Sequence, residues 1–571
     1  MSKIIYIVSK DRLNPTQTQH KLTQISHALE PENIVARPAK IAITPHVAYR
    51  IINPESHLLI HQNSVLLGKL FNPPKATPWY QINEELLDGS FALFRENAKE
   101  VQILSDPTAS KTIWYYHDED YFIASTSQRA IIMFLGSFEL DLETIPWMLS
   151  TGTLGPTHAW DRRIKRLPVD SNIVLNKANW HCHQTNQAIT FAPTPKEIHK
   201  EERALENSLR SIIKHLKIDF KTWRLPLSGG YDSRGLLALF YQEQKEEIHS
   251  LKTVTWGLKS VASDPKGDAH IAKKVAQHFG VPNQYYPTET ANEPIERIVQ
   301  RFLLLGEGRI ENINGYMDGF ALWKQLYEDG VEGIIRGDEG FGWSQSVSSQ
   351  REVRYLNGCA LCSDFENLKR YSFATHQRLP QTLQQSDDES LEVWRDRLHH
   401  LYRLPTFSAA LSDLKSAYMD VLNPILSRKL LQQIRTLPEP FRDRTLFERI
   451  VDRITPKIEF ATNNSIASHQ KILSDPSLLQ QMLDALNTPQ AKQLFPKNFL
   501  KQLANEANTQ PKPEHLFQKA LRGIARLIKG GKKGKRIPKS INPQRLLFRV
   551  HIILGMNDIL TNDAGRLKHV Q

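Results

Sequence analysis

The segment from residue 227 to 233, Leu-Ser-Gly-Gly-Tyr-Asp-Ser, places two hydroxyl groups, two glycines and one carboxylate close together. Glycine permits backbone conformations and close approaches that a side chain forbids, so the N–H groups of this segment can face an anion. The serine hydroxyls can add hydrogen bonds to that anion. A carboxylate belongs in such a site when a cation accompanies the phosphates, so Asp232 indicates Mg²⁺. A glycine-rich turn between a strand and a capped helix is the structural alternative.

The elements around this segment fit a phosphate site. A short apolar run, residues 224–227, precedes it, and a helical pattern begins near Asp232 and continues to Phe240. The positive end of that helix would point at the same anion. Further apolar strands at 250–256 and 333–336 alternate with long amphipathic stretches, which is typical of a parallel α/β sheet.

The two ends of the chain have different patterns. Up to about residue 195, short β-type runs separated by Pro, Asn, Asp and Gly predict an antiparallel, layered, β-rich domain. From about residue 395 the pattern is helical with proline breaks. The strands predicted in the first part are 4–8, 57–60, 65–67, 90–94, 101–104, 112–116 and 121–124.

Composition narrows the class of protein. A chain of 571 residues is expected to form two or three domains. The excess of 73 Lys and Arg over 61 Asp and Glu gives a net charge of +12, which favours anionic partners such as nucleotides, nucleic acid or acidic peptides. No apolar run is long enough to cross a bilayer, and the 3 cysteines cannot form a disulfide framework for a chain of this size. A cytoplasmic protein is therefore expected.

Several segments, taken in order along the chain, resemble the asparagine synthetase family. The Ser-Gly-Gly-x-Asp-Ser segment after a strand is similar to the pyrophosphate-binding loop of the ATP pyrophosphatases, which cleave ATP between its α and β phosphates. Similar segments follow at 263–286, where Asp268 stands at the usual acidic position, at 330–343 and at 423–456. Residues 87–94 and 138–175 also look like the glutaminase-type domain of the family and its connection.

The resemblance implies an α/β fold in two parts. Residues 1–195 would form an Ntn-hydrolase-like, layered β-rich domain, and residues 196–571 a parallel α/β ATP-pyrophosphatase-type synthetase domain with a basic, helical C-terminal part from about 395. ATP and Mg²⁺ would be the cofactors, with Asp232 and Asp338 as the metal ligands. The implied nucleotide-binding residues are Leu227, Ser228, Gly229, Gly230, Asp232, Ser233 and Gly337.

The resemblance also implies catalytic residues. A lysine of the C-terminal part usually stabilises charge as the adenylate forms. Lys457 is the implied residue, and Lys471 is the other candidate. Glu311 is implied to orient the incoming amine or to act as a base, and Glu307 and Asp318 lie in the same segment.

The start of the chain departs from the glutamine-dependent members of the family. Those members expose an N-terminal cysteine as the nucleophile that attacks the amide. Ser2 stands at that position here, and the glutamine-holding motifs are absent. The first domain is therefore expected to be inactive. The amine is then expected to belong to the substrate, as in the β-lactam synthetases and lasso peptide cyclases that the chain resembles.

The expected function is ATP-dependent amide formation, in which a carboxylate is adenylated with release of pyrophosphate and an amine then displaces AMP. A lasso-peptide macrolactam cyclase is the favoured type. Asparagine synthesis from ammonia and a catalytically inactive nucleotide-binding scaffold remain alternatives. The expected partners are a carboxylate-bearing small molecule or precursor peptide and a leader-peptide-processing protease, with neither nucleic acid nor membrane insertion.

Overall fold

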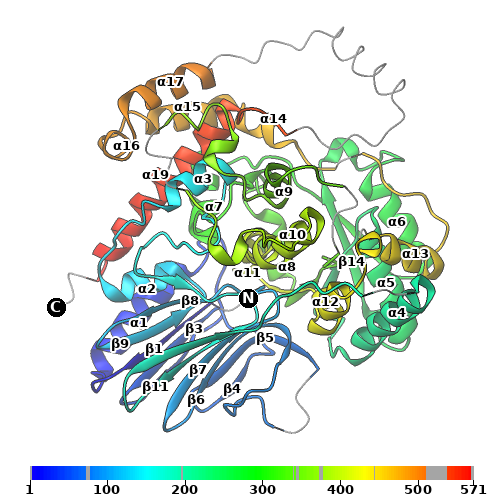
Figure 1. Cartoon of the computed structure of the whole chain (residues 1–571), viewed down its shortest axis with the longest axis horizontal. Helices are drawn as coiled ribbons and strands as arrows, with labels where there is room; N and C mark the ends of the chain where they lie inside the picture. Colours follow the sequence, from blue (N-terminus) through cyan, green and yellow to red (C-terminus); the bar gives the residue numbers. More distant parts are fainter. Residues whose placement is uncertain are drawn as a thin grey trace.

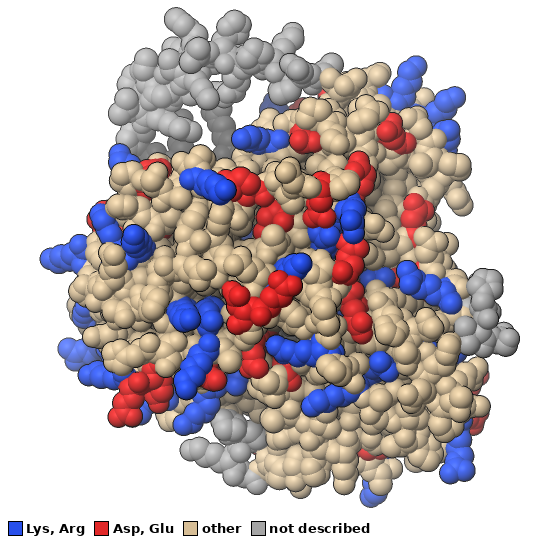
Figure 2. All heavy atoms as spheres, turned by 180° about the vertical axis from the view of Figure 1, so that it is seen from behind, with Lys and Arg blue, Asp and Glu red and all other residues tan. Residues whose placement is uncertain are grey.

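The computed structural model describes residues 3–72, 77–194, 197–338, 340–341, 346–371, 377–442, 444–463, 465–508 and 537–567. Two antiparallel sheets form the first part of the chain, a parallel sheet follows, and helices make up most of the remainder (Figure 1). Among the described residues, no helix is both long enough and apolar enough to span a bilayer. Basic and acidic side chains are interspersed over the face drawn in Figure 2.

The first part is a stack of two six-stranded antiparallel sheets. Their strand orders are β10-β8-β9-β1-β3-β2 and β12-β11-β7-β6-β5-β4. The strands are β1 (Lys3–Ser9), β2 (Lys40–Ile43), β3 (Val47–Ile52), β4 (Leu59–His61), β5 (Ser64–Asn72), β6 (Asp88–Glu96), β7 (Glu100–Ser105), β8 (Trp114–His117), β9 (Tyr121–Ser125), β10 (Lys165–Arg166), β11 (Ser171–Asn176) and β12 (His181–Asn186).

Strand β1 shows how the layers arise. Ile4 and Tyr6 pack into the core between the two sheets. Ile5 points the other way, into a core shared with helices α1 (Pro15–Leu29) and α2 (Gln128–Leu135). Successive strand residues face opposite sides of a sheet, so a strand that is apolar throughout requires a cover on both faces. The first sheet is therefore covered by helices on one face and by the second sheet on the other.

The parallel sheet has the order β15-β14-β13-β16-β17, and each neighbouring pair is parallel. Its strands are β13 (Trp223–Pro226), β14 (Lys252–Gly257), β15 (Asn283–Pro287), β16 (Gly333–Ile335) and β17 (Asp420–Leu422). The chain builds from β13 outward to β15 and then returns to the other side of β13 with β16. The loops after β13 and β16 therefore leave the sheet side by side at its carboxyl edge. Such a reversal of strand order creates a crevice that commonly binds ligands.

Among the described residues, the helices after α2 are α3 (Thr144–Thr151), α4 (Ile198–His215), α5 (Tyr231–Glu243), α6 (Asp268–His278), α7 (Ile295–Gly306), α8 (Ala321–Glu328), α9 (Gln350–Asn357), α10 (Leu391–Leu398), α11 (Ala409–Ser416), α12 (Arg428–Arg435), α13 (Thr445–Ile454), α14 (His469–Leu473), α15 (Pro476–Ala485), α16 (Pro489–Leu494), α17 (Lys497–Asn508) and α19 (Pro543–Gly565). Helices α4 to α13 surround this sheet or connect its strands, and the remaining helices pack beside them or on the first part of the chain. A π-helical segment, η7 (His399–Ser408), joins α10 to α11 and contains Pro405. Proline has no N–H to donate, which fits the widened turns there.

The long C-terminal helix α19 returns to the first part of the chain. It packs against α2, α3 and α7, and Figure 1 shows it in red beside the cyan α2. The buried Arg129 of α2 donates from Nε to Asp563 Oδ2 of α19 at 2.7 Å. Residues of both ends of the chain thus share one core. The domain boundary at 195/196 stays a prediction.

The α/β fold class, with a layered β-rich first part and a parallel-sheet second part, confirms the fold prediction. Strand β17 is a detail that the sequence pattern does not predict. Among the described residues from about 395 onward it lies between helices, and it adds the edge of the parallel sheet beside β16. Its three residues, Asp420 to Leu422, are all buried, and so short a segment carries no period that distinguishes a strand from a helix.

Candidate functional site

The turn between β13 and α5 is held by its two serines. The backbone N–H of Ser228 donates to Ser233 Oγ at 3.0 Å, and the two hydroxyl oxygens lie 3.1 Å apart. The N–H of Gly230 donates to Ser228 Oγ at 3.2 Å. Gly230 precedes the first residue of α5, so the positive end of this helix points into the turn. The predicted loop from Leu227 to Ser233 is thus built as a helix N-terminus closed by hydroxyls.

Gly229 has a packing role. Its N–H donates to Asp268 Oδ1 at 2.8 Å, and its carbonyl accepts from the N–H of Ala461 at 3.1 Å. A Cβ at residue 229 would lie 2.2 Å from the Cβ of Ala461. Ser465 Oγ also donates to Asp268, at 3.2 Å. The glycine therefore lets the segment around Ala461 cover the turn, and Asp268 ties the two together.

Gly337 brings the loop after β16 onto the loop after β13. A Cβ at residue 337 would lie 2.9 Å from both the carbonyl carbon and the carbonyl oxygen of Asp232. The next residue, Asp338, therefore enters the same crevice. Burial raises the pKa of Asp232, Arg444 opposes this shift, and the negative charge of Asp338 adds to it. The two carboxylates predicted to share a metal ion are electrostatically coupled.

Each of these carboxylates is paired with an arginine. Arg444 Nη2 donates to Asp232 Oδ1 at 2.7 Å, and Arg336 Nη2 donates to Asp338 Oδ1 at 2.9 Å. The second oxygen of Asp338, Oδ2, is buried and accepts no hydrogen bond from the described residues. A buried carboxylate oxygen without a partner, next to a second carboxylate, is suited to a hard cation that prefers oxygen ligands. Asp232 and Asp338 therefore fit the predicted Mg²⁺.

These residues open into a cavity of about 600 Å³ at the carboxyl edge of the parallel sheet. The turn, Asp232 and Asp338 line one side of it. Trp256 and Trp323, which meet edge to face with ring centroids 5.4 Å apart, line another part. The cavity thus combines phosphate-type donors, two acids and an aromatic wall, which is the mixture expected of a nucleotide pocket.

Lys415 is a lining residue that the sequence pattern does not predict. It lies on α11, is only 6% exposed, and its Nζ donates to Tyr316 Oη at 3.0 Å and to the Leu411 carbonyl at 2.8 Å. Burial lowers its pKa well below the usual range, and the charge of Arg336 acts in the same direction. A buried lysine facing this cavity is a candidate cation for an anionic ligand. Its neighbours in sequence, Asp-Leu-Lys-Ser-Ala, match no motif that would have revealed it.

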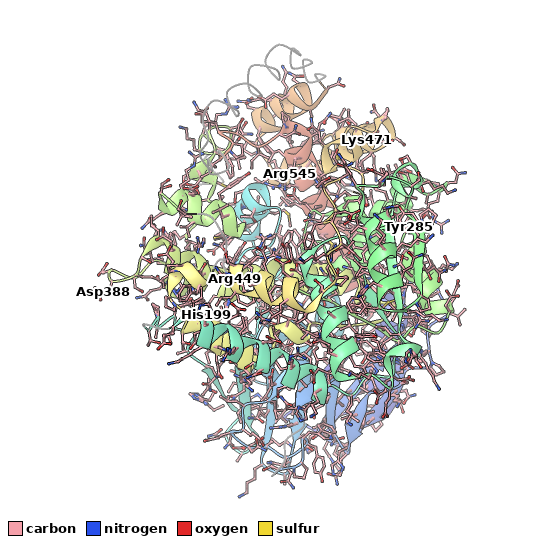
Figure 3. The ribbon with its side chains drawn as sticks, turned by 90° about the vertical axis from the view of Figure 1, so that its right-hand side faces the viewer. His199, Tyr285, Asp388, Arg449, Lys471 and Arg545 are labelled. Atoms are coloured by element: carbon pink, nitrogen blue, oxygen red, sulfur yellow. The ribbon has the colours of Figure 1, made fainter. Side chains whose placement is uncertain are left out.

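The two lysines implied by the resemblance lie elsewhere. Lys457 is exposed and is not among the residues lining the cavity. Lys471 lies on the exposed side of α14 (Figure 3). The carbonyls of Ile458 and Glu459 accept from Arg234 at 2.6 and 2.9 Å, so this stretch does pack onto α5. The catalytic role of Lys457 stays a prediction.

Glu311 is held by two arginines of α19. Arg549 Nε donates to Glu311 Oε2 at 2.7 Å, and Arg545 Nε donates to Oε1 at 2.8 Å. Burial alone would raise the pKa of this carboxyl, but Arg549 and Arg545 outweigh it and lower the pKa to about 2. So acidic a group is a weak base. The arrangement favours a positioning role for Glu311 over proton transfer, and its catalytic role stays a prediction.

The other two acids of this segment have structural partners. Glu307 accepts from Lys3 Nζ at 3.3 Å and from the N–H of Gln128 at 2.9 Å, which ties it to the first part of the chain. Asp318 accepts from the N–H groups of Phe320 and Leu322 and caps α8.

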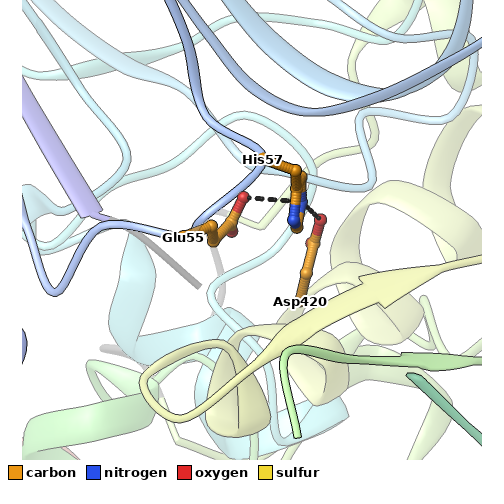
Figure 4. A group of neighbouring side chains, drawn as sticks. All are labelled: Glu55, His57 and Asp420. Atoms are coloured by element: carbon orange, nitrogen blue, oxygen red, sulfur yellow. Dashed lines mark hydrogen bonds and ion pairs between the residues drawn. The ribbon is translucent and has the colours of Figure 1, made fainter. Parts of the chain in front are cut away.

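A second cluster of ionisable groups lies where the first part of the chain meets β17. His57 Nε2 lies 3.0 Å from Glu55 Oε2 and 3.1 Å from Asp420 Oδ2 (Figure 4). Among the described residues, these three form the group whose possible metal-ligand atoms all lie within 4.8 Å of one another. The ammonium of Lys111 also contacts Asp420. Two cationic side chains thus balance two carboxylates, and the cluster forms an internal ion network.

His57 carries its proton in this network. Burial alone would lower its pKa, but hydrogen bonds to Asp420 and Glu55 raise the pKa to about 9. The imidazolium therefore joins residues 55–57 to the edge of the parallel sheet. It lies outside the lining of the cavity described above.

No protein-family model and no curated protein matches the chain. Two solved structures are similar over part of it. The first is a glutamine phosphoribosylpyrophosphate amidotransferase from B. subtilis complexed with ADP and GMP, with 10% identity and a TM-score of 0.20 over 50% of this chain and 65% of that one. The second is described as the allosteric regulatory enzyme of purine biosynthesis, with 11% identity and a TM-score of 0.21 over 62% of this chain and 77% of that one. The chain thus spans just under two thirds of the first structure, and the account of the site rests on its own geometry.

Proposed function

We propose that the protein is an ATP-dependent amide-forming synthetase, which adenylates a substrate carboxylate, releases pyrophosphate and then transfers the acyl group to an amine. The observation that carries this proposal is the shared cavity of about 600 Å³. In it the hydroxyl groups of Ser228 and Ser233, at the start of α5, share the lining with the two coupled carboxylates Asp232 and Asp338. Anion donors beside cation ligands are what a metal–polyphosphate complex requires.

The chain's own residues supply binding and orientation. The N-terminus of α5 and the Ser228 and Ser233 hydroxyls would hold the departing pyrophosphate. Magnesium held by Asp232 and Asp338 would neutralise phosphate charge. Lys415 would donate a hydrogen bond or a positive charge on the facing side of the cavity, where developing negative charge is most strongly stabilised because little water is present.

The acceptor amine would belong to the substrate itself, as in a macrolactam-forming cyclase acting on a precursor peptide. The proposal draws support for this from Ser2, which stands where a glutamine-dependent enzyme has its cysteine nucleophile and lies outside the described residues. Asparagine formation from free ammonia is the related alternative.

A catalytically inactive nucleotide-binding scaffold is the competing function. The ion pairs of Arg444 with Asp232 and of Arg336 with Asp338 favour it, because each gives one oxygen of its carboxylate a cationic partner without a metal. A synthetase must exchange these arginines for a metal ion and phosphates when ATP binds.

Product analysis separates these functions. The protein is incubated with Mg²⁺, ATP and a panel of carboxylic acids and peptides, and AMP and pyrophosphate are quantified. Asp232→Ala is expected to lower their formation about 100-fold or more. Asp388→Ala is the matched control, because this aspartate is exposed at the edge of the molecule (Figure 3) and is expected to behave as wild type. Release of ADP, or equal turnover by Asp232→Ala, contradicts the synthetase.

A further inference from the structure

A second cavity adjoins the one that holds the phosphate-type turn. It has a volume of about 440 Å³, within the range of small-molecule sites. Asn312 and Phe407 line both cavities, so the two chambers are neighbours across these side chains. The second chamber is built from the end of α3, the end of α9, segment η7 and the start of α19.

The charged side chains lining this second chamber are mostly basic. They are one carboxylate, Glu311, and three guanidinium groups, Arg403, Arg545 and Arg549. Both oxygens of Glu311 are engaged by Arg545 and Arg549. The sum of these charges is positive, and a low-polarity cavity strengthens the attraction of such a sum for an anion.

Glu311 fixes the arginines. Its side chain is 2% exposed, whereas that of Arg545 is 47% exposed. Arg549 donates from Nη1 to the Leu149 carbonyl at 2.7 Å, which anchors α19 to α3. The buried Glu311 carboxylate therefore fixes both guanidinium groups, and the side chain of Arg545 stays partly exposed. A fixed guanidinium recognises a carboxylate with good geometry and a small loss of side-chain entropy.

Arg403 enters the same chamber from another element. It lies on η7, and its guanidinium carbon is 4.9 Å from the ring centre of Phe407. This contact orients Arg403 beside the side chain that separates the two chambers.

Asn357 adds an unpaired acceptor to the lining. It is fully buried, and its Nδ2 donates to the Val353 and Arg395 carbonyls, each at 3.1 Å. Its Oδ1 accepts no hydrogen bond among the described residues. A buried acceptor without a partner calls for a donor, such as an ordered water or an N–H group of the ligand, so Asn357 would contact a part of the ligand other than its carboxylate.

We propose that this chamber binds a carboxylate of the substrate that is not the one activated by ATP. The inference rests on the proposed function, because the adenylated carboxylate must reach the first cavity. The substrate class is then a compound with at least two carboxylates, or an acidic peptide. One carboxylate crosses between Asn312 and Phe407 toward the nucleotide, and another is held by Arg545 and Arg403.

The test measures binding without turnover. Saturation-transfer NMR on the full chain at pH 7 compares glutarate, a dianion, with glutaramide, its neutral analogue of similar size. Glutarate is expected to bind at least about tenfold more tightly. Arg545→Gln and Arg403→Gln are each expected to weaken glutarate binding about tenfold, in line with the loss of one charge-assisted hydrogen-bonding group.

Two control variants keep the result interpretable. Arg566→Gln also removes an arginine at α19, at its C-terminal end and outside the chamber, and is expected to bind glutarate as wild type does. Asp232→Ala is expected to bind glutarate normally even where it forms no AMP, so failure of the synthetase and failure of this inference are distinguishable. Equal binding of glutarate and glutaramide, no detectable binding of either, or unchanged glutarate binding in both chamber variants overturns the inference. Thermal melting of each variant verifies that it is folded.

Discussion

Gly337 packs directly on the backbone of Asp232. A Cβ at residue 337 would lie 2.9 Å from the Asp232 carbonyl group, closer than folded proteins allow for such a contact. Neither residue is near the other in sequence, so this contact fixes the distance between the loops after β13 and β16. The two carboxylates of the site are neighbours because residue 337 has no side chain.

Gly337→Ala is therefore expected to separate the two loops. Overpacking against backbone costs about 1–3 kcal/mol. The KM for Mg²⁺·ATP should rise about tenfold while the far-ultraviolet circular dichroism stays that of the wild type. Gly565→Ala is the matched control, because a Cβ at residue 565 meets nothing within 4 Å and this residue lies outside the lining of the cavity. Unchanged ATP kinetics in Gly337→Ala would show that the contact does not set the site.

Lys415 is expected to act on the nucleotide, whereas Lys457 is exposed. Lys415→Met keeps the volume of the side chain and removes its polar end. It should lower the rate of AMP formation about 100-fold, the usual cost of removing one group that stabilises developing charge. Because burial disfavours a charge at this position and lowers the pKa of Lys415, replacing it with an uncharged side chain should not lower the melting temperature.

Lys457→Met is the comparison for that prediction. Its rate of AMP formation is expected to stay within about threefold of wild type. A large loss with Lys457→Met and a small one with Lys415→Met would instead support the role that the sequence resemblance gives to Lys457.

The loop residues could be predicted from sequence, whereas their partners could not. Ser228, Asp232 and Ser233 lie within six residues of one another and form a recognisable local pattern. Arg444 reaches Asp232 from the residue before α13, and Lys415 reaches the cavity from α11, both much later in the chain. A contact between distant segments leaves no periodic signal, so only the folded chain reveals it.

The strands of the sheets also differ in how well the sequence predicts them. Strand β1 could be predicted because residues 4–8 form a continuous apolar run. The structure buries this run on both faces of the sheet. Strand β12 is a polar edge strand, His-Cys-His-Gln-Thr-Asn, with exposed or half-exposed side chains on both faces. It has no alternation of apolar and polar residues for a sequence pattern to detect.

The His57 network predicts a dependence of stability on pH. The pKa of His57 is about 9 in the folded protein and about 6.5 in the unfolded chain. The folded state therefore holds the proton more tightly, and the network's contribution of about 3 kcal/mol is complete below pH 6.5 and is lost as the pH rises through 9. Urea unfolding at pH 6.5 and pH 9.5 measures it.

His57→Gln should lose this part of the pH dependence. His199→Gln, at an exposed histidine that Figure 3 labels, should retain it. The same slope of unfolding free energy against pH in His57→Gln and wild type would contradict the assignment of the proton to His57.

The ion pair between Arg129 and Asp563 is expected to couple the two ends of the chain. Both side chains are almost fully buried, so Arg129→Met leaves the Asp563 carboxylate with only the more exposed Arg566, at 3.4 Å, and should cost up to about 3–5 kcal/mol of unfolding free energy. The double variant Arg129→Met, Asp563→Leu removes both charges and should recover much of that loss. Urea denaturation measures the unfolding free energy of the single and the double variant. An equal loss in the single and double variants would show that the ion pair itself, and not the burial of an unpaired charge, carries the effect.

³¹P NMR of ATP consumption, in the presence of Mg²⁺ and a carboxylate substrate from the panel, follows the proposed cleavage of ATP directly. AMP and pyrophosphate signals are expected to grow together in equal amounts with the wild-type protein and not with Asp232→Ala. Appearance of ADP and inorganic phosphate, or the same AMP and pyrophosphate signals from Asp232→Ala, would contradict the proposed function.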